Sequence, residues 1–177
     1  VKSGERYFYV WSHRKNIGTP LDTGSMLMIA EFDPVHPERL ISEPKCLSRP
    51  LYGFENTEHT INNEGPYAFY YHNKIYLAYS GGDARGYLYA IGMLTANDGD
   101  DLCDLSVWEK AKTPIASFAT IPGEYGPGHN SFFWDRDQNL WIAYHAVTSF
   151  EEKILSSGMR RVYFEQDKTP RFDVIVE

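Results

Sequence analysis

The sequence predicts an all-β protein, because its apolar residues fall into short runs and no window shows a convincing helical period. The runs are rich in Tyr, Phe, Val and Ile, which favour strands. Gly, Pro, Asn and Asp, which favour turns, separate them. The expected strands are Arg6–Trp11, Met26–Phe32, Tyr67–Tyr71, Ile75–Tyr79, Tyr87–Leu94, Ser131–Trp134, Leu140–Ala146 and Arg160–Glu165.

Three of these runs resemble one another, which indicates an internal repeat. They are GERYFYVWS, NKIYLAYS and QNLWIAYHA; the first two end in serine, and the third has His145 at that position. Aligning the runs pairs Trp11 with Tyr79, 68 positions later, and Tyr79 with Tyr144, 65 positions later. The chain therefore repeats itself with a period of about 65 residues.

A repeat of this length with about four strands is typical of a β-propeller blade, a four-stranded sheet that packs on its neighbours around a central channel. A second landmark gives nearly the same period, because Pro50 and Pro114 lie 64 positions apart. We predict one partial β-propeller domain over the chain, with approximate blades at residues 1–50, 51–115 and 116–177. Since propellers close with about four to eight blades, we expect a fragment, or completion by another chain.

The composition argues against two classes of partner. With 17 basic and 24 acidic residues, the chain has a formal net charge of −7 and should repel nucleic acid and anionic membranes.

Cys46 and Cys103 lie in no metal-binding or redox spacing, so both are expected to be reduced. Residues 1–19 lack a signal-peptide pattern, and no apolar stretch approaches the roughly 20 residues that span a bilayer. We expect a soluble protein, secreted or cytoplasmic.

Glu64 and His129 are the candidate site residues that the repeat indicates. Each precedes the aligned tyrosine of its repeat, Tyr79 or Tyr144, by 15 positions, so we predict that they occupy the same place in successive blades. Both lie among Gly and Pro, in NNEGP and YGPGHNSF, where a strand begins. Because the first strand of a blade lines the channel, the two side chains should converge on one pocket.

Four motifs, in this order, resemble glycoside hydrolase family 43. They are NEGP at Asn63–Pro66, YGPGHNSF at Tyr125–Phe132, YHA at Tyr144–Ala146 and a last strand led by Arg160. The resemblance covers essentially the whole chain. It implies a five-bladed β-propeller that hydrolyses α-L-arabinofuranosides or β-xylosides with inversion.

The resemblance also implies roles for individual residues. The family uses an Asp as general base, a second Asp that tunes the acid, and the Glu of an EGP motif as general acid. Only the Glu has a counterpart here, Glu64, and both aspartates are expected upstream of Val1. His129 matches a central His that contacts a channel ion or water, which implies a structural calcium, and Arg160 matches an Arg that holds the sugar. The reaction is expected to require no cofactor.

These residue types suit the chemistry. Inverting hydrolysis needs a protonated carboxyl group that donates to the departing oxygen, and a carboxylate about 6.5–9.5 Å away that activates a water on the opposite face. A glutamate must be kept protonated by burial or by a neighbouring carboxylate to act as the acid at neutral pH. We expect an arabinose- or xylose-containing glycan as substrate, and an isolated chain that is incomplete without the base.

Other interpretations of the same residues stay open. A Glu in a Gly-Pro turn, such as Glu64, is also typical of a solvated loop, and His129 of a structural hydrogen bond. Arg160 would also suit a solvent-facing position beside Arg161, and Glu55 in YGFEN is interpreted as structural support for the pocket. A carbohydrate-binding or scaffolding propeller without activity would use the same aromatic residues and channel. A generic protein-binding propeller would need no pocket at Glu64.

Overall fold

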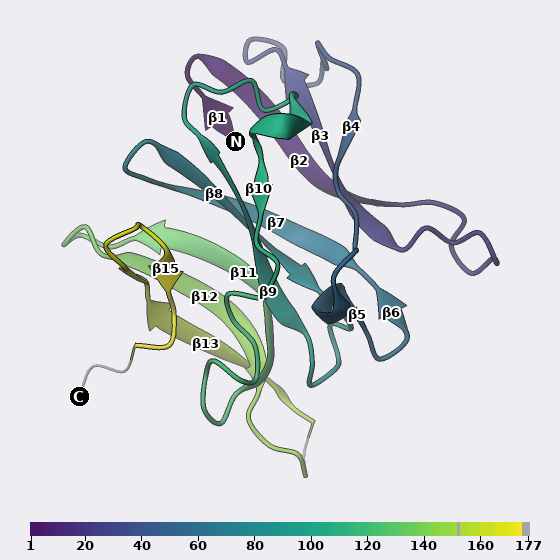
Figure 1. The fold of residues 1–177 in the computed structure, drawn as a ribbon, viewed down its shortest axis with the longest axis vertical. Helices are drawn as coiled ribbons and strands as arrows, with labels where there is room; N and C mark the ends of the chain where they lie inside the picture. Colours follow the sequence, from purple (N-terminus) through teal and green to yellow (C-terminus); the bar gives the residue numbers. More distant parts are fainter. Residues whose placement is uncertain (152, 175–177) are drawn as a thin grey trace.

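The computed structural model describes residues 1–151 and 153–174, which form antiparallel sheets joined by loops (Figure 1). The first sheet contains β1 (Lys2–Ser3), β2 (Arg6–Arg14), β3 (Ser25–Phe32) and β4 (Lys45–Ser48). The second contains β7 (Asn63–Tyr71), β8 (Lys74–Gly81), β9 (Ala90–Asn97) and β10 (Glu109–Lys110). The third contains β11 (Tyr125–Trp134), β12 (Leu140–Val147) and β13 (Leu155–Arg161).

Smaller elements lie between and after the strands of these sheets. Two short ladders pair β5 (Asn56–Thr57) with β6 (Thr60–Ile61), and β14 (Tyr163–Phe164) with β15 (Pro170–Arg171). The 3-10 helices are η1 (Gly53–Glu55) and η2 (Leu105–Val107). Within the described residues, no helix is long and apolar enough to cross a membrane.

The strands of each large sheet are neighbours in chain order, and the three sheets follow one another across the molecule. Figure 1 shows the first sheet at the upper right, the second through the centre and the third at the lower left. One large sheet lies within each of the segments 1–50, 51–115 and 116–177. The all-β class is confirmed, and the division into blades of one closed ring stays a prediction.

Most predicted strands overlap observed ones, and the largest errors concern edge strands. The single strand predicted at Arg160–Glu165 is wrong in its bounds, because the segment contains the end of β13, Leu155–Arg161, and then the separate strand β14. Strand β4 was not predicted. Both strands, with the sequences LSSGMRR and KCLS, lie at a sheet edge and carry no alternating apolar run. Their positions follow from pairing with the neighbouring strand instead.

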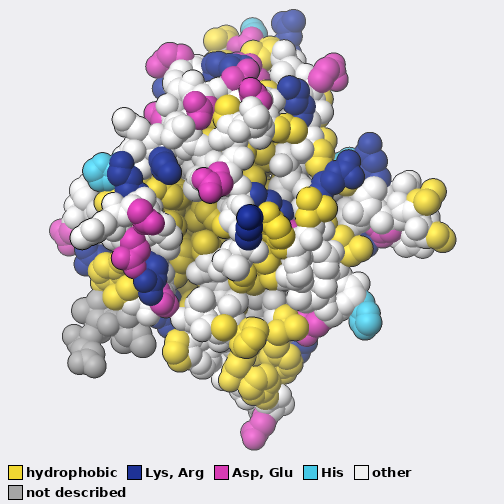
Figure 2. Space-filling view, viewed as in Figure 1, with side chains coloured by type: hydrophobic (Ala, Val, Ile, Leu, Met, Phe, Trp, Pro, Cys, Tyr) yellow, Lys and Arg dark blue, Asp and Glu magenta, His cyan; other side chains and the backbone are white. Residues whose placement is uncertain are grey.

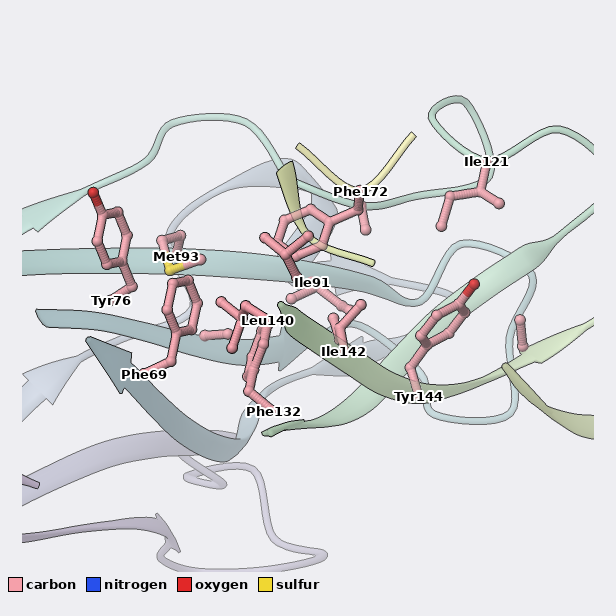
Figure 3. Close-up of a cluster of buried hydrophobic side chains, with 14 residues drawn as sticks. Phe69, Tyr76, Ile91, Met93, Ile121, Phe132, Leu140, Ile142, Tyr144 and Phe172 are labelled. Atoms are coloured by element: carbon pink, nitrogen blue, oxygen red, sulfur yellow. The ribbon is translucent and has the colours of Figure 1, made fainter. Parts of the chain in front are cut away.

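Two apolar layers hold the sheets together. The layer between the first and second sheets includes the buried side chains of Phe8, Leu27, Ile29, Ile75 and Leu77. The layer between the second and third sheets is drawn in Figure 3 and includes Phe69, Tyr76, Met93, Phe132, Leu140 and Ile142. Strand β8 is buried at every position from Ile75 to Gly81, because both of its faces are covered. Burying each large side chain contributes about 1.5–3 kcal/mol.

The aligned tyrosines, Tyr79 of β8 and Tyr144 of β12, lie against glycines of the following strand. Tyr79 pairs with Gly92, and Tyr144 pairs with Gly158. A Cβ atom on Gly92 would lie 2.3 Å from the Tyr79 ring, and one on Gly158 would lie 2.7 Å from the Tyr144 ring. Each ring therefore covers bare backbone, and the structure confirms that the two tyrosines are equivalent in successive sheets.

The hydroxyl of Tyr79 holds a buried glutamate. It donates to Oε1 of Glu55 at 2.7 Å, while Oε2 accepts the N–H groups of Leu51 and Tyr52 at 2.6 and 2.8 Å. Lys110 Nζ forms an ion pair with Oε1 at 2.5 Å, and burial lowers the pKa of Lys110 despite this carboxylate. Since a buried charge is tolerated when it is paired and hydrogen-bonded, these contacts give Glu55 a structural role.

Gly92→Ala is expected to destabilise the fold by about 1–3 kcal/mol, because the added methyl group overlaps the Tyr79 ring and forces a shift. Chemical denaturation followed by tryptophan fluorescence would measure the change in midpoint. Gly53→Ala is the matched control, since a Cβ atom there meets nothing within 4 Å. Equal costs for the two substitutions would contradict the packing explanation.

Candidate active site

Glu64 lies near the start of β7, where a bulge interrupts the pairing with β8. It faces Ser80 in the register, and the next paired residue is Tyr67, opposite Ala78. A bulge re-aims the side chains around it. The Glu64 side chain is half-buried, and its Oε1 accepts a hydrogen bond from the Tyr89 hydroxyl at 2.7 Å. This hydrogen bond therefore fixes one of the two oxygens of the carboxyl group.

His129 lies on β11, the first strand of the third sheet, and has a left-handed backbone. Its φ is 51°, and Gly65 on β7 has a φ of 56°. The N–H of His129 donates to Ser80 Oγ at 2.7 Å, and the N–H of Gly65 donates to Ser12 Oγ at 3.2 Å. Ser12 and Ser80 end the repeated runs GERYFYVWS and NKIYLAYS. The same hydrogen bond thus joins each sheet to the next.

These hydrogen bonds correct the repeat alignment by one position. His129 takes the place of Gly65, and Gly128 takes the place of Glu64. In the strand pairing, Gly128 faces the residue of β12 that corresponds to the β8 partner of Glu64. The prediction that Glu64 and His129 occupy the same place in successive sheets is therefore wrong.

The lengths of two turns explain the error. Four residues separate the paired Tyr70 and Ile75 in the second sheet, whereas five separate the paired Trp134 and Leu140 in the third. Counting the same 15 positions back from Tyr144 therefore stops one residue short of Gly128, at His129. A register is defined by hydrogen bonds, and a turn can absorb an extra residue without changing it.

The two predicted residues nevertheless lie close together. A Cβ atom on Gly65, the neighbour of Glu64, would lie 3.6 Å from the His129 ring, an ordinary contact distance. The His129 side chain is exposed, so it faces solvent beside the half-buried carboxyl group. The structure brings Glu64 and His129 to one place.

Tyr89 and His145 also belong to the candidate site around Glu64 and His129, and neither was predicted as a functional residue. Tyr89 is completely buried, and its ring stacks on that of His145 with centroids 5.6 Å apart. The rings of His145 and His129 are 6.3 Å apart. Burial, and then the charge of His129, lowers the pKa of His145, so its imidazole is neutral at neutral pH. No motif indicates Tyr89, because its contact with Glu64 arises only when the sheets pack.

A calcium ion at His129 is a poor fit to the described residues alone. In residues 1–151 and 153–174, no group of three or more His, Cys, Asp or Glu could hold a metal ion. Calcium takes about six to eight oxygen ligands. Beside His129, the buried side chain of Asn130 lacks a hydrogen-bond partner within this part of the chain, which offers one oxygen. The calcium stays a prediction, and no step of the chemistry depends on it.

Arg160, the predicted sugar-holding residue, is engaged within the third sheet. Its Nε donates to the Tyr144 hydroxyl and its Nη2 to Glu124 Oε1, each at 2.9 Å. The Tyr144 hydroxyl donates to Glu124 Oε2 at 2.6 Å. This set repeats the tyrosine–glutamate–lysine set of the second sheet. Arg160 itself lies on β13, which β12 separates from β11. A sugar-holding role for Arg160 stays a prediction.

The loops beyond the strand ends carry exposed apolar side chains. Leu88 follows β8, Phe118 follows β10 and Phe150 follows β12, with exposed fractions of 41%, 49% and 63%. Figure 2 shows hydrophobic side chains gathered toward the lower end of the molecule, where acidic and basic side chains are sparse. Exposed apolar patches often mark binding surfaces.

A family model matches almost the whole chain. The model described as Glycosyl hydrolases family 43 matches residues 1–170. The chain belongs to glycosyl hydrolases family 43. The resemblance to this family is confirmed, and the roles of the individual residues stay predictions.

Curated relatives of this family-43 chain are arabinofuranosidases. An extracellular exo-α-(1→5)-L-arabinofuranosidase of Streptomyces avermitilis is 29% identical over 184 residues, which cover 99% of this chain and 37% of the relative. A protein of the same name from Streptomyces chartreusis is 34% identical over 144 residues, covering 81% of this chain and 42% of the relative. The chain spans less than half the length of these relatives.

Solved structures agree with the fold. The crystal structure of an α-L-arabinofuranosidase from Lactobacillus brevis matches with a TM-score of 0.82 and 27% identity, covering 97% of this chain and 53% of that one. A thermostable family-43 glycoside hydrolase matches with a TM-score of 0.75 and 22% identity, covering 97% and 55%. The β-propeller class is confirmed, and the number of blades in the ring stays a prediction.

Arg160→Lys is expected to lower stability by about 1–2 kcal/mol, because an ammonium group cannot reproduce the two directed hydrogen bonds to Glu124 and Tyr144. Urea denaturation would measure the loss. Arg161→Lys, at an exposed position on the same strand, serves as the control and should change little. A variant at Arg160 with wild-type stability and a raised KM would support sugar binding instead.

Proposed function

We propose that this chain contributes the acid side of a glycosidase active site, with Glu64 as the general acid. The observation that carries the proposal is the position of its carboxyl group. It is half-buried at the start of the first strand of a sheet, with Oε1 bound by Tyr89, beside the exposed ring of His129. A carboxyl group held through one oxygen can present the other to a bound glycan.

Among arabinose- and xylose-containing glycans, we favour α-L-arabinofuranosides as the substrates. The curated relatives at 29% and 34% identity and the solved structure at 27% identity are named arabinofuranosidases. A xylan β-1,4-xylosidase from Bacillus halodurans is 14% identical and supports the fold alone.

In the proposed reaction, Glu64 donates its proton to the glycosidic oxygen as the bond to the sugar breaks. A water activated by a second carboxylate attacks the opposite face, which inverts the anomeric centre. The base and the tuning aspartate stay predictions, expected upstream of Val1. We assign His129 to substrate binding, because an exposed imidazole beside the acid can form a hydrogen bond with a sugar hydroxyl.

Glu64→Gln in the natural full-length protein is expected to lower kcat on an arabino-oligosaccharide by about 10²–10⁴-fold, because an amide cannot donate the proton. Hydrolysis of 4-nitrophenyl α-L-arabinofuranoside should fall much less, since nitrophenolate departs without protonation. Initial rates on the two substrates measure the difference. Calorimetric titration should show that the variant still binds the oligosaccharide.

Glu109→Gln is the matched control, because Glu109 is exposed on β10 and should be irrelevant to both substrates. Unchanged hydrolysis by the Glu64 variant would refute the acid assignment. Sugar binding without hydrolysis in the wild-type protein would favour a non-catalytic carbohydrate-binding propeller. Proton NMR of the first product should show the inverted anomer.

A further inference from the structure

Tyr89 lies between the second and third sheets with no exposed surface. It ends the connection from β8 to β9, and its ring stacks on that of His145 with an interplanar angle of 12°. On another side the ring lies on the backbone of Gly128, where a Cβ atom would be only 2.1 Å away. These two contacts confine the ring, so its hydroxyl has a defined position.

The correspondence between Gly128 and Glu64 explains how Tyr89 reaches the carboxyl group. Gly128 stands where the third sheet would otherwise carry its counterpart of Glu64, and the Tyr89 ring occupies that space. Gly126 acts similarly, since a Cβ atom there would lie 2.2 Å from the carbonyl oxygen of Gly86. The glycines of YGPGHNSF therefore let the segment that carries Tyr89 lie directly on β11.

A chain of polar contacts connects the third sheet to Glu64. The N–H of His129 donates to Ser80 Oγ at 2.7 Å, Ser80 acts on the Tyr89 hydroxyl and lowers its pKa, and Tyr89 donates to Glu64 Oε1 at 2.7 Å. Burial, with the charge of Glu64 adding to it, raises the pKa of Tyr89, so the hydroxyl keeps its proton. Linked hydrogen bonds polarise and strengthen one another.

We propose that Tyr89 is a positioning residue for the general acid, holding Oε1 of Glu64 so that Oε2 carries the catalytic proton toward the glycosidic oxygen. The inference rests on the proposed function of Glu64. An oxygen that accepts this hydrogen bond cannot donate along the same line, so the proton resides on the other oxygen. The hydrogen bond also fixes the plane of the carboxyl group, because rotation would break it.

Tyr79 provides a matched comparison within the same chain. It is also completely buried, its ring lies over Gly92, and its hydroxyl donates to Glu55 at 2.7 Å. Glu55 is fully buried and paired with Lys110, away from solvent. Removing the hydroxyl of Tyr79 should therefore cost stability without affecting the acid.

Tyr89→Phe in the natural full-length protein is expected to lower kcat on an arabino-oligosaccharide by about ten- to a hundred-fold, with little change in KM. The lost hydrogen bond stabilised the ionised carboxylate, so the alkaline limb of the kcat–pH profile should move to higher pH. Tyr79→Phe should lower the Tm and leave both kcat and that limb unchanged.

Ser80→Ala removes the next link of the chain without altering either ring, and should move the alkaline limb in the same direction by a smaller amount. If Tyr89→Phe fails to fold, the pH profile of Ser80→Ala tests the inference instead. The inference is overturned if the folded variants keep the wild-type kcat and pH profile while Glu64→Gln loses hydrolysis. Full activity of Glu64→Gln would instead overturn the proposed function.

Discussion

The contact of a tyrosine ring with the backbone of a glycine is a constraint on both the strand pairing within the sheets and the packing between them. Within the described part of the chain it occurs three times, as Tyr79 on Gly92, Tyr144 on Gly158 and Tyr89 on Gly128. In each case the hydroxyl donates to a glutamate, at 2.6 or 2.7 Å. The ring supplies the apolar surface that glycine lacks, while the hydroxyl satisfies a carboxylate at the margin of the core. A glycine is therefore required opposite each ring, since any Cβ atom would occupy the space of the ring.

The fold was predictable where burial of a strand requires its residues to be apolar. Strand β8 is covered on both faces, and the run from Ile75 to Gly81 is correspondingly apolar. The strand β13 alternates between exposed and half-buried positions at a sheet edge, so its own residues are polar or small. Its position depends on pairing with β12, which no local pattern reveals. The edge strands β4 and β13 were therefore the parts of the fold that the sequence located least well.

The motifs of the candidate site could be predicted from the sequence, whereas the contacts between its residues could not. Glu64 and His129 could be found because NEGP and YGPGHNSF are continuous stretches of chain. Their relative register could not, because it depends on one additional residue in a turn. Tyr89 could not be found either, since it lies 25 positions from Glu64 and meets it only through packing on β11. The partners of Arg160 likewise follow from the tertiary structure.

The three tyrosine–glutamate contacts differ in whether a cation lies beside the carboxylate. This difference distinguishes the two structural glutamates from the proposed acid. Glu55 is paired with Lys110 and Glu124 with Arg160, whereas Glu64 forms no ion pair within residues 1–151 and 153–174. A neighbouring cation stabilises the ionised form of a carboxyl group, which suits a permanent support and would oppose an acid. A hydroxyl donor can serve both states, because it binds a carboxylate oxygen as well as the carbonyl oxygen of a protonated acid. The same contact thus supports an ion-paired carboxylate at Glu55 and Glu124, and under the proposed function it positions the acid Glu64.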